Sequence, residues 1–125
     1  MKILRHACRE KSEFLQVHFH LPDDYDRMNT ALIDRQSGGT YMIKKINRDK
    51  APSAIGPYSQ GICTGNLLFT SGQIPVNPET GAIPDDFEAQ ARQVMENLKA
   101  IAAEAGSDLS KAVKTTCFLA DMSDF

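Results

Sequence analysis

The pattern of hydrophobic and polar residues is most regular near the C-terminal end, where it predicts an amphipathic helix. Six apolar residues recur at alternating spacings of four and three and so share one stripe: Phe87, Ala91, Val94, Leu98, Ile101 and Ala105. Asp85 can cap this helix, and Glu88 three residues later completes a pattern like a capping box. Gly106 stands where glycine commonly ends a helix. We therefore expect one helix with a buried face.

Shorter runs predict β-strands on both sides of this helix. Residues 60–64 and 67–71 flank Gly65-Asn66, which is a strong signal for a two-residue hairpin turn. Residues 43–46 are suited to an edge strand, and residues 113–119 alternate between apolar and polar types. The order of three strands, a helix and a strand predicts an α+β domain, in which the helix covers one face of a sheet.

The first 41 residues lack such a pattern. Their apolar residues form short clusters with no sustained period of 3.6 or 2, and Ser37-Gly38-Gly39 is typical of a linker. We expect residues 1–41 to be a poorly ordered extension or the product of an upstream start codon, and residues 42–125 to form the domain. Residues 121–124 look like the start of another helix at which the sequence stops, so we expect the domain to be incomplete there.

Composition excludes several broad classes of protein. A chain of 125 residues has room for one small domain. Its net charge of −2 argues against a nucleic-acid groove built on bulk electrostatics, and no apolar run approaches the roughly 20 residues of a membrane span. The three cysteines are odd in number and far apart, without CxxC spacing, so we expect reduced thiols and a cytoplasmic location.

The segment from Ala51 to Gln73 carries the candidate chemistry. Gly56-Pro57-Tyr58 places a phenol on a loop just before a strand, where its hydroxyl could meet a ligand. Ser71-Gly72-Gln73 ends a strand with a glycine, which lets a ligand approach the backbone amide closely. The alternative is that Tyr58 caps a hydrophobic edge and Gly72 forms a bulge. Composition and spacing alone favour this structural alternative.

Two other sets of reactive side chains are better explained by structure than by chemistry. One rival interpretation makes a metal cluster of His6, Cys8, His18 and His20. The stretch His18-Phe19-His20 alternates like a strand, which would put both of its imidazoles on one side. No further ligand stands at a recognisable spacing, so we predict no metal site. Cys117 belongs to the apolar set of its strand and no histidine follows it, so we predict a buried structural thiol.

Four stretches of the chain carry a resemblance to a known family: IGPYSQG (55–61), FTSGQIPVNPETG (69–81), QARQVMENLKAI (90–101) and VKTTCFLADMSDF (113–125). They resemble the RidA/YjgF family of reactive-intermediate deaminases, and the resemblance runs from Met42 to Phe125. It implies a chorismate-mutase-like α+β fold, a homotrimer with clefts between subunits, and no metal or organic cofactor. It also implies hydrolysis of 2-aminoacrylate-type imines and enamines to 2-keto acids and ammonia.

The resemblance also assigns site residues. Tyr58 corresponds to a tyrosine that lines the cleft, and Gly72 to the strand-end glycine whose amide faces the substrate carboxylate, with Ser71 and Gln73 beside it. The arginine that clamps the carboxylate in the family, and the glutamate that orients water, fall after Phe125. We therefore expect the chain as written to be inactive. The alternative function is a non-catalytic module of the same fold that binds a small ligand.

Overall fold

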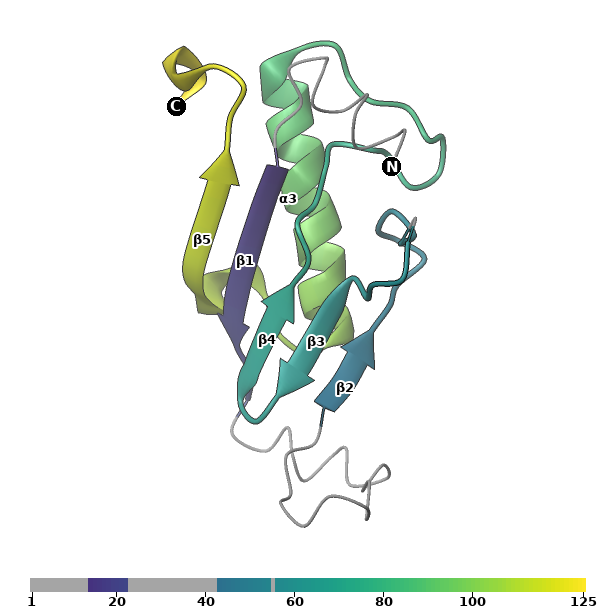
Figure 1. The fold of residues 1–125 in the computed structure, drawn as a ribbon, viewed down its shortest axis with the longest axis vertical. Coiled ribbons are helices and arrows are strands. Elements are labelled where there is room, and N and C mark those ends of the chain that lie inside the picture. The colour runs from purple at the N-terminus through teal and green to yellow at the C-terminus, as the bar shows by residue number, and fades with distance from the viewer. Residues whose placement is uncertain (1–13, 23–42, 55) are drawn as a thin grey trace.

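The computed structural model describes residues 14–22, 43–54 and 56–125. In this part of the chain, one five-stranded antiparallel sheet packs against one long helix (Figure 1). The strands lie in the order β2-β3-β4-β1-β5. The elements are β1 (Phe14–His20), β2 (Ile43–Ile46), β3 (Gly61–Thr64), β4 (Leu67–Thr70), α3 (Phe87–Glu104), β5 (Ala112–Phe118), and single 3₁₀ turns at Leu109–Lys111 and Met122–Asp124. The predicted α+β architecture is confirmed.

The predicted helix is confirmed, with a start one residue later than expected. The side chain of Asp86, rather than Asp85, accepts a hydrogen bond from the Ala89 amide at 2.9 Å. Asp86 has the extended backbone typical of a capping residue, so its carboxylate can reach an amide of the first turn. At the other end Gly106 has a positive φ of 73°, a conformation that glycine adopts without steric cost.

The buried face of α3 is partly polar. Gln90 and Asn97 are buried, whereas Phe87 at the first turn is 36% exposed. Asn97 Nδ2 donates to the carbonyl oxygens of Ile74 at 3.1 Å and Val76 at 3.0 Å, which joins the helix to the segment that follows β4. The hydrogen bonds offset the cost of burying the amide. The apolar stripe predicted from the sequence is therefore buried from Val94 to Ala105. Two hydrogen-bonded polar side chains, Gln90 and Asn97, share this buried face.

The hairpin of β3 and β4 forms as predicted, with Gly65 at a positive φ of 52° in its turn. Strand β2 pairs with β3 at the edge of the sheet, as expected for residues 43–46. Side chains on one face of these strands pack onto α3 to form the core. The fully buried apolar residues of this core include Ile46, Cys63, Leu68, Val94, Leu98 and Ile101.

Strand β1 corrects the expectation for the N-terminal region. Residues Phe14–His20 lie inside the sheet, between β4 and β5, so the prediction of poor order is wrong for this segment (Figure 1). Val17, Phe19 and Leu21 are buried in the core. The strand-like alternation noted at His18-Phe19-His20 covers only three residues, which are too few to predict a strand. The rest of residues 1–41 lies outside the described residues, and the upstream start codon stays a prediction.

Strand β5 corrects the prediction for Cys117, whose side chain is exposed. Among the described residues β5 pairs only with β1, so it is an edge strand, and six of its seven residues are exposed. Alternation alone did not reveal that no layer of the described residues covers this strand. The turn at Met122–Asp124 agrees with the predicted helix start. Among the described residues, no helix combines the length and hydrophobicity that a membrane span requires.

Candidate functional site

The candidate site lies at the end of the β3–β4 hairpin that is opposite its turn, where Gln60 faces Ser71. Pairing continues one step beyond the strands, since the Ser71 amide donates to the Gln60 carbonyl at 2.8 Å. The Ser71 hydroxyl donates to the carbonyl of Ser59 at 2.6 Å. Ser59 follows Tyr58 directly, and Ser71 precedes Gly72. The structure therefore brings together the two short segments that the sequence singled out separately.

Gly72 and Tyr58 are the two members of the predicted site that are open to a ligand. Tyr58 is 47% exposed, and Gly72 is half-buried. Within the described part of the chain, no hydrogen bond is recorded from the Gly72 amide. A backbone N–H is an obligatory hydrogen-bond donor, so this amide is available to a solvent or ligand oxygen.

Ser71 and Gln73 are instead engaged inside the protein. The Ser71 hydroxyl and amide both donate to the neighbouring segment, as described above. Gln73 is buried, and its amide donates to the Leu15 carbonyl at 2.9 Å. Its side-chain nitrogen lies 3.3 Å from the carbonyl oxygens of both Ser71 and Gly72. Both residues thus hold the strand end on either side of Gly72.

Gln60 is a buried residue of this region that the sequence analysis missed. Its side-chain nitrogen shares its donors among the carbonyl oxygens of Arg48 at 3.0 Å, Ala51 at 3.1 Å and Pro52 at 2.8 Å. Its side-chain oxygen accepts from the Arg48 amide. These bonds hold the loop after β2 against the open end of the hairpin. No local pattern indicates these partners, because they stand 8 to 12 residues away.

The histidines examined as metal ligands have other contacts. The His18 ring lies against the Phe69 ring, with centroids 4.7 Å apart. His20 Nε2 is 3.0 Å from the side-chain nitrogen of Asn66. Among the described residues, no three His, Cys, Asp or Glu side chains are placed to hold a metal ion. His6 and Cys8 lie outside these residues.

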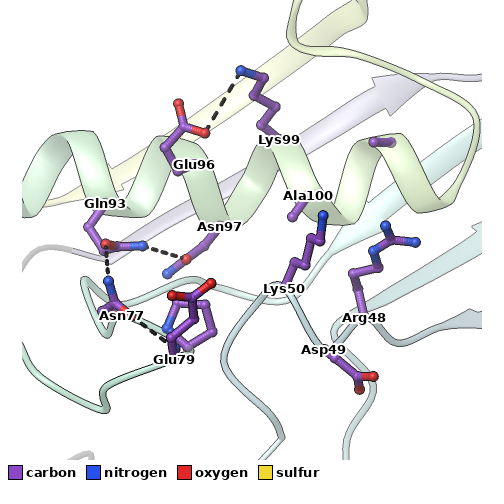
Figure 2. A pocket seen from close by; sticks show the side chains of 12 residues that line it. Arg48, Asp49, Lys50, Asn77, Glu79, Gln93, Glu96, Asn97, Lys99 and Ala100 are labelled. Carbon is purple, nitrogen blue, oxygen red and sulfur yellow. Dashed lines mark hydrogen bonds and ion pairs between the residues drawn. The ribbon is translucent and has the colours of Figure 1, made fainter.

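A separate hollow of about 580 Å³ lies between α3 and the loops that follow β2 and β4 (Figure 2). Its charged lining residues are Arg48, Lys50 and Lys99 together with Asp49, Glu79 and Glu96. The positive and negative side chains are equal in number, so the lining does not indicate whether a ligand would be an anion or a cation. The side-chain nitrogen of Gln93 donates to the side-chain oxygen of Asn97 at 2.9 Å, and the side-chain nitrogen of Asn77 lies 3.5 Å from the side-chain oxygen of Gln93. The side-chain amides that line the hollow therefore bond to one another. None of the predicted site residues lines this hollow.

Comparison with known proteins places this hairpin and helix in a family. Residues 48–125 match the family model described as Endoribonuclease L-PSP. The chain is 57% identical over 84 residues to the RutC family protein PM1466 of Pasteurella multocida, covering 67% of this chain and 65% of that protein. It is 55% identical over 84 residues to the 2-iminobutanoate/2-iminopropanoate deaminase of Escherichia coli K12, covering 67% and 66%.

Solved structures give the same result. The crystal structure of the YjgF gene product of Escherichia coli is similar with a TM-score of 0.52 and 56% identity, over 53% of this chain and 52% of that one. The chain spans slightly less than two thirds of the length of the curated relatives it matches.

Proposed function

We propose, because the chain belongs to the endoribonuclease L-PSP (RidA/YjgF) family, that it serves in the hydrolysis of 2-aminoacrylate-type imines and enamines. The products would be 2-keto acids and ammonia. Relatives with this activity in their names support the proposal, among them the deaminase of Escherichia coli K12. The observation that carries it is the Gly72 amide, which has no hydrogen-bond partner among the described residues and ends a strand beside the Tyr58 segment.

The chemistry asks for a carboxylate site next to an imine carbon. Water adds to the carbon of the C=N bond, the C–N bond then breaks, and ammonia leaves while the carbon becomes a ketone. In the proposal the Gly72 N–H donates to the substrate carboxylate, a charge-assisted hydrogen bond. Tyr58 lines the cleft over the imine, and Ser71 and Gln73 hold the strand end. The resemblance places the clamping arginine and the water-orienting glutamate in family segments that have no counterpart among residues 1–125.

A coupled assay tests this function. A pyridoxal-phosphate dehydratase acting on threonine supplies 2-iminobutanoate, and the release of 2-oxobutanoate is followed with and without the chain. Faster release than with the dehydratase alone supports the deaminase. Binding of 2-oxobutanoate without faster release agrees with the inactivity expected of residues 1–125, and it leaves the alternative, a non-catalytic binding module, as the function of these residues. A chain that neither accelerates release nor binds 2-oxobutanoate contradicts both.

The face of the sheet opposite α3, which no described element covers, supports a homotrimer. Helix α3 covers one face of the sheet (Figure 1). By the register of the strands, the opposite face carries Ile43, Ile62 and Phe69, all of them exposed. Ile62 and Phe69 are directly opposite each other on β3 and β4, so their side chains form one apolar surface. We propose that this face contacts other copies of the chain. Sedimentation should then give three times the monomer mass of 13.8 kDa.

Phe69→Glu should lower that mass to the monomer's, because it places a charge in the proposed contact. Phe125→Glu is the matched control, since Phe125 is exposed at the far end of the chain. A monomeric parent chain would contradict the trimer.

A cytoplasmic location and a reaction without metal or organic cofactor complete the proposal. Cys117 is an exposed free thiol, which suits a reducing compartment. The proposed hydrolysis uses only water, hydrogen bonds and proton transfer. Activity that survives treatment with a metal chelator would support the second point.

A further inference from the structure

We infer that strand β1, which lies outside the family-matched residues 48–125, positions the Gly72 amide by imposing a β-bulge on the strand end that carries it; this rests on the proposed function of Gly72. The pairing on either side of Gly72 carries the inference. His18 pairs with Phe69, and Leu15 pairs with Gln73. On β1, Leu15 and His18 are three residues apart, whereas their partners Gln73 and Phe69 are four residues apart.

One extra residue therefore lies on the β4 side between these two pairs. Such a bulge leaves a residue unpaired and turns its backbone away from the ladder. The bulged stretch is residues 70–72, and it ends on Gly72, whose amide has no recorded partner among the described residues. The sequence left two alternatives for Gly72, a bulge or a ligand site. In our inference both apply, because the bulge is what presents the Gly72 amide to a ligand.

Hydrogen bonds from β1 close the bulge at both ends. After Gly72, the Leu15 amide donates to the Gln73 carbonyl at 3.1 Å and the Gln73 amide donates to the Leu15 carbonyl at 2.9 Å. Before it, the Thr70 hydroxyl donates to the Val17 carbonyl at 2.8 Å and accepts from the Val17 amide at 3.0 Å. Thr70 is 1% exposed, so water cannot replace this hydroxyl.

The Thr70 hydroxyl takes the place of a backbone pair. A regular ladder would bond Val17 to the backbone of residue 70, but here the side chain satisfies both backbone groups of Val17. The Thr70 carbonyl is left to accept from the side-chain nitrogen of Gln16 at 3.0 Å. Thr70 and Gln16 are therefore positioning residues, which act on a ligand through the placement of Gly72.

Substitution of Thr70 in the full chain tests this role. Thr70→Val keeps the shape but leaves both backbone groups of Val17 without a partner, whereas Thr70→Ser keeps the hydroxyl. The probe is 2-oxobutanoate, and its Kd is read from the shift of the Gly72 amide signal in ¹⁵N NMR. Loss of a buried hydrogen-bond partner predicts a Kd raised about 5- to 150-fold in Thr70→Val. Thr70→Ser should stay within about 3-fold.

Thr64→Val is the matched control, because Thr64 lies on the same hairpin and no side-chain hydrogen bond of it is recorded among the described residues. Hydrogen exchange separates positioning from general stability. Thr70→Val should speed exchange at the Gln73 amide more than at Leu98 in the helix core, whereas a purely structural role would speed both equally. Thr64→Val should change neither the Kd nor this ratio.

The outcomes are distinct. A folded Thr70→Val chain with the parent's Kd and the parent's exchange at Gln73 overturns the inference. If Thr70→Val does not fold, Gln16→Ala replaces it, since that change removes one hydrogen bond from a half-buried side chain. An unchanged Kd in Gln16→Ala then overturns the inference. If the parent chain itself binds no 2-oxobutanoate, the proposed function fails, and exchange at Gln73 alone still decides whether β1 holds the bulge.

Discussion

Phe19 offers the most direct test of the place of β1 in the fold. Its side chain is 0% exposed and belongs to the core cluster between the sheet and α3. Had the first 41 residues been a loose extension, truncating this side chain would change nothing. Because β1 lies between β4 and β5 and Phe19 packs in this core, Phe19→Ala instead leaves a cavity between the sheet and α3.

The size of the effect follows from core truncations in general. Replacing a buried phenylalanine with alanine costs about 3–5 kcal/mol, from lost hydrophobic transfer plus the cavity left behind. Domains of this size are stable by roughly 5–15 kcal/mol, so about a fifth or more of the free energy of unfolding is lost. The midpoint of thermal unfolding should fall by roughly 10–20 °C.

Urea titration followed by circular dichroism measures this loss. Phe125→Ala is the matched control, because Phe125 is 91% exposed and its removal should change the free energy of unfolding by less than about 0.5 kcal/mol. Equal unfolding midpoints for the two variants would refute the placement of Phe19 in the core. The β1-dependent bulge at Gly72 would then lose its basis as well.

Three further predictions concern local structure. Asp86→Ala should cost about 1 kcal/mol of stability in urea titration, whereas Asp85→Ala should cost less than about 0.5, because only Asp86 caps α3. Gly106→Ala should cost about 1 kcal/mol, since alanine is strained at a φ of 73°. Hydrogen bonds from Ser110 hold the pKa of Asp108 below its ordinary 3.8. The resulting stabilisation is full above pH 3.8 and is lost as the pH falls through the lower folded-state pKa, and carbon NMR should show that pKa rising in Ser110→Ala.

The parts of the fold that sequence predicted well are those whose signals are local. The stripe from Val94 to Ile101 and the Gly65-Asn66 turn each depend on residues within a few positions of one another. Their conformations are therefore encoded in a short window. The one-residue error at the helix start has the same origin, because Asp85 and Asp86 are both good capping residues and only the backbone conformation decides between them.

The parts that sequence missed depend on distant pairing. Strand β1 finds its partners about 50 residues away on β4 and about 100 away on β5, and no window of residues 14–22 contains that information. Cys117 shows the reverse error. Alternation indicated a buried face, but burial requires a covering layer, and the described residues supply none over the edge strand β5.

The candidate site combines both kinds of information. The family-matched hairpin supplies the groups that would meet a ligand, Tyr58 and the Gly72 amide, and motif resemblance located them. In our inference the placement of the Gly72 amide depends on the hydrogen bonds of Leu15 with Gln73 and of Val17 with Thr70, and Leu15 and Val17 lie outside the matched residues 48–125. Two chains with the same hairpin sequence can therefore present the Gly72 amide differently, if the strand beside it differs. On our inference, the affinity of the candidate site depends on the pairing with β1 as much as on the motif.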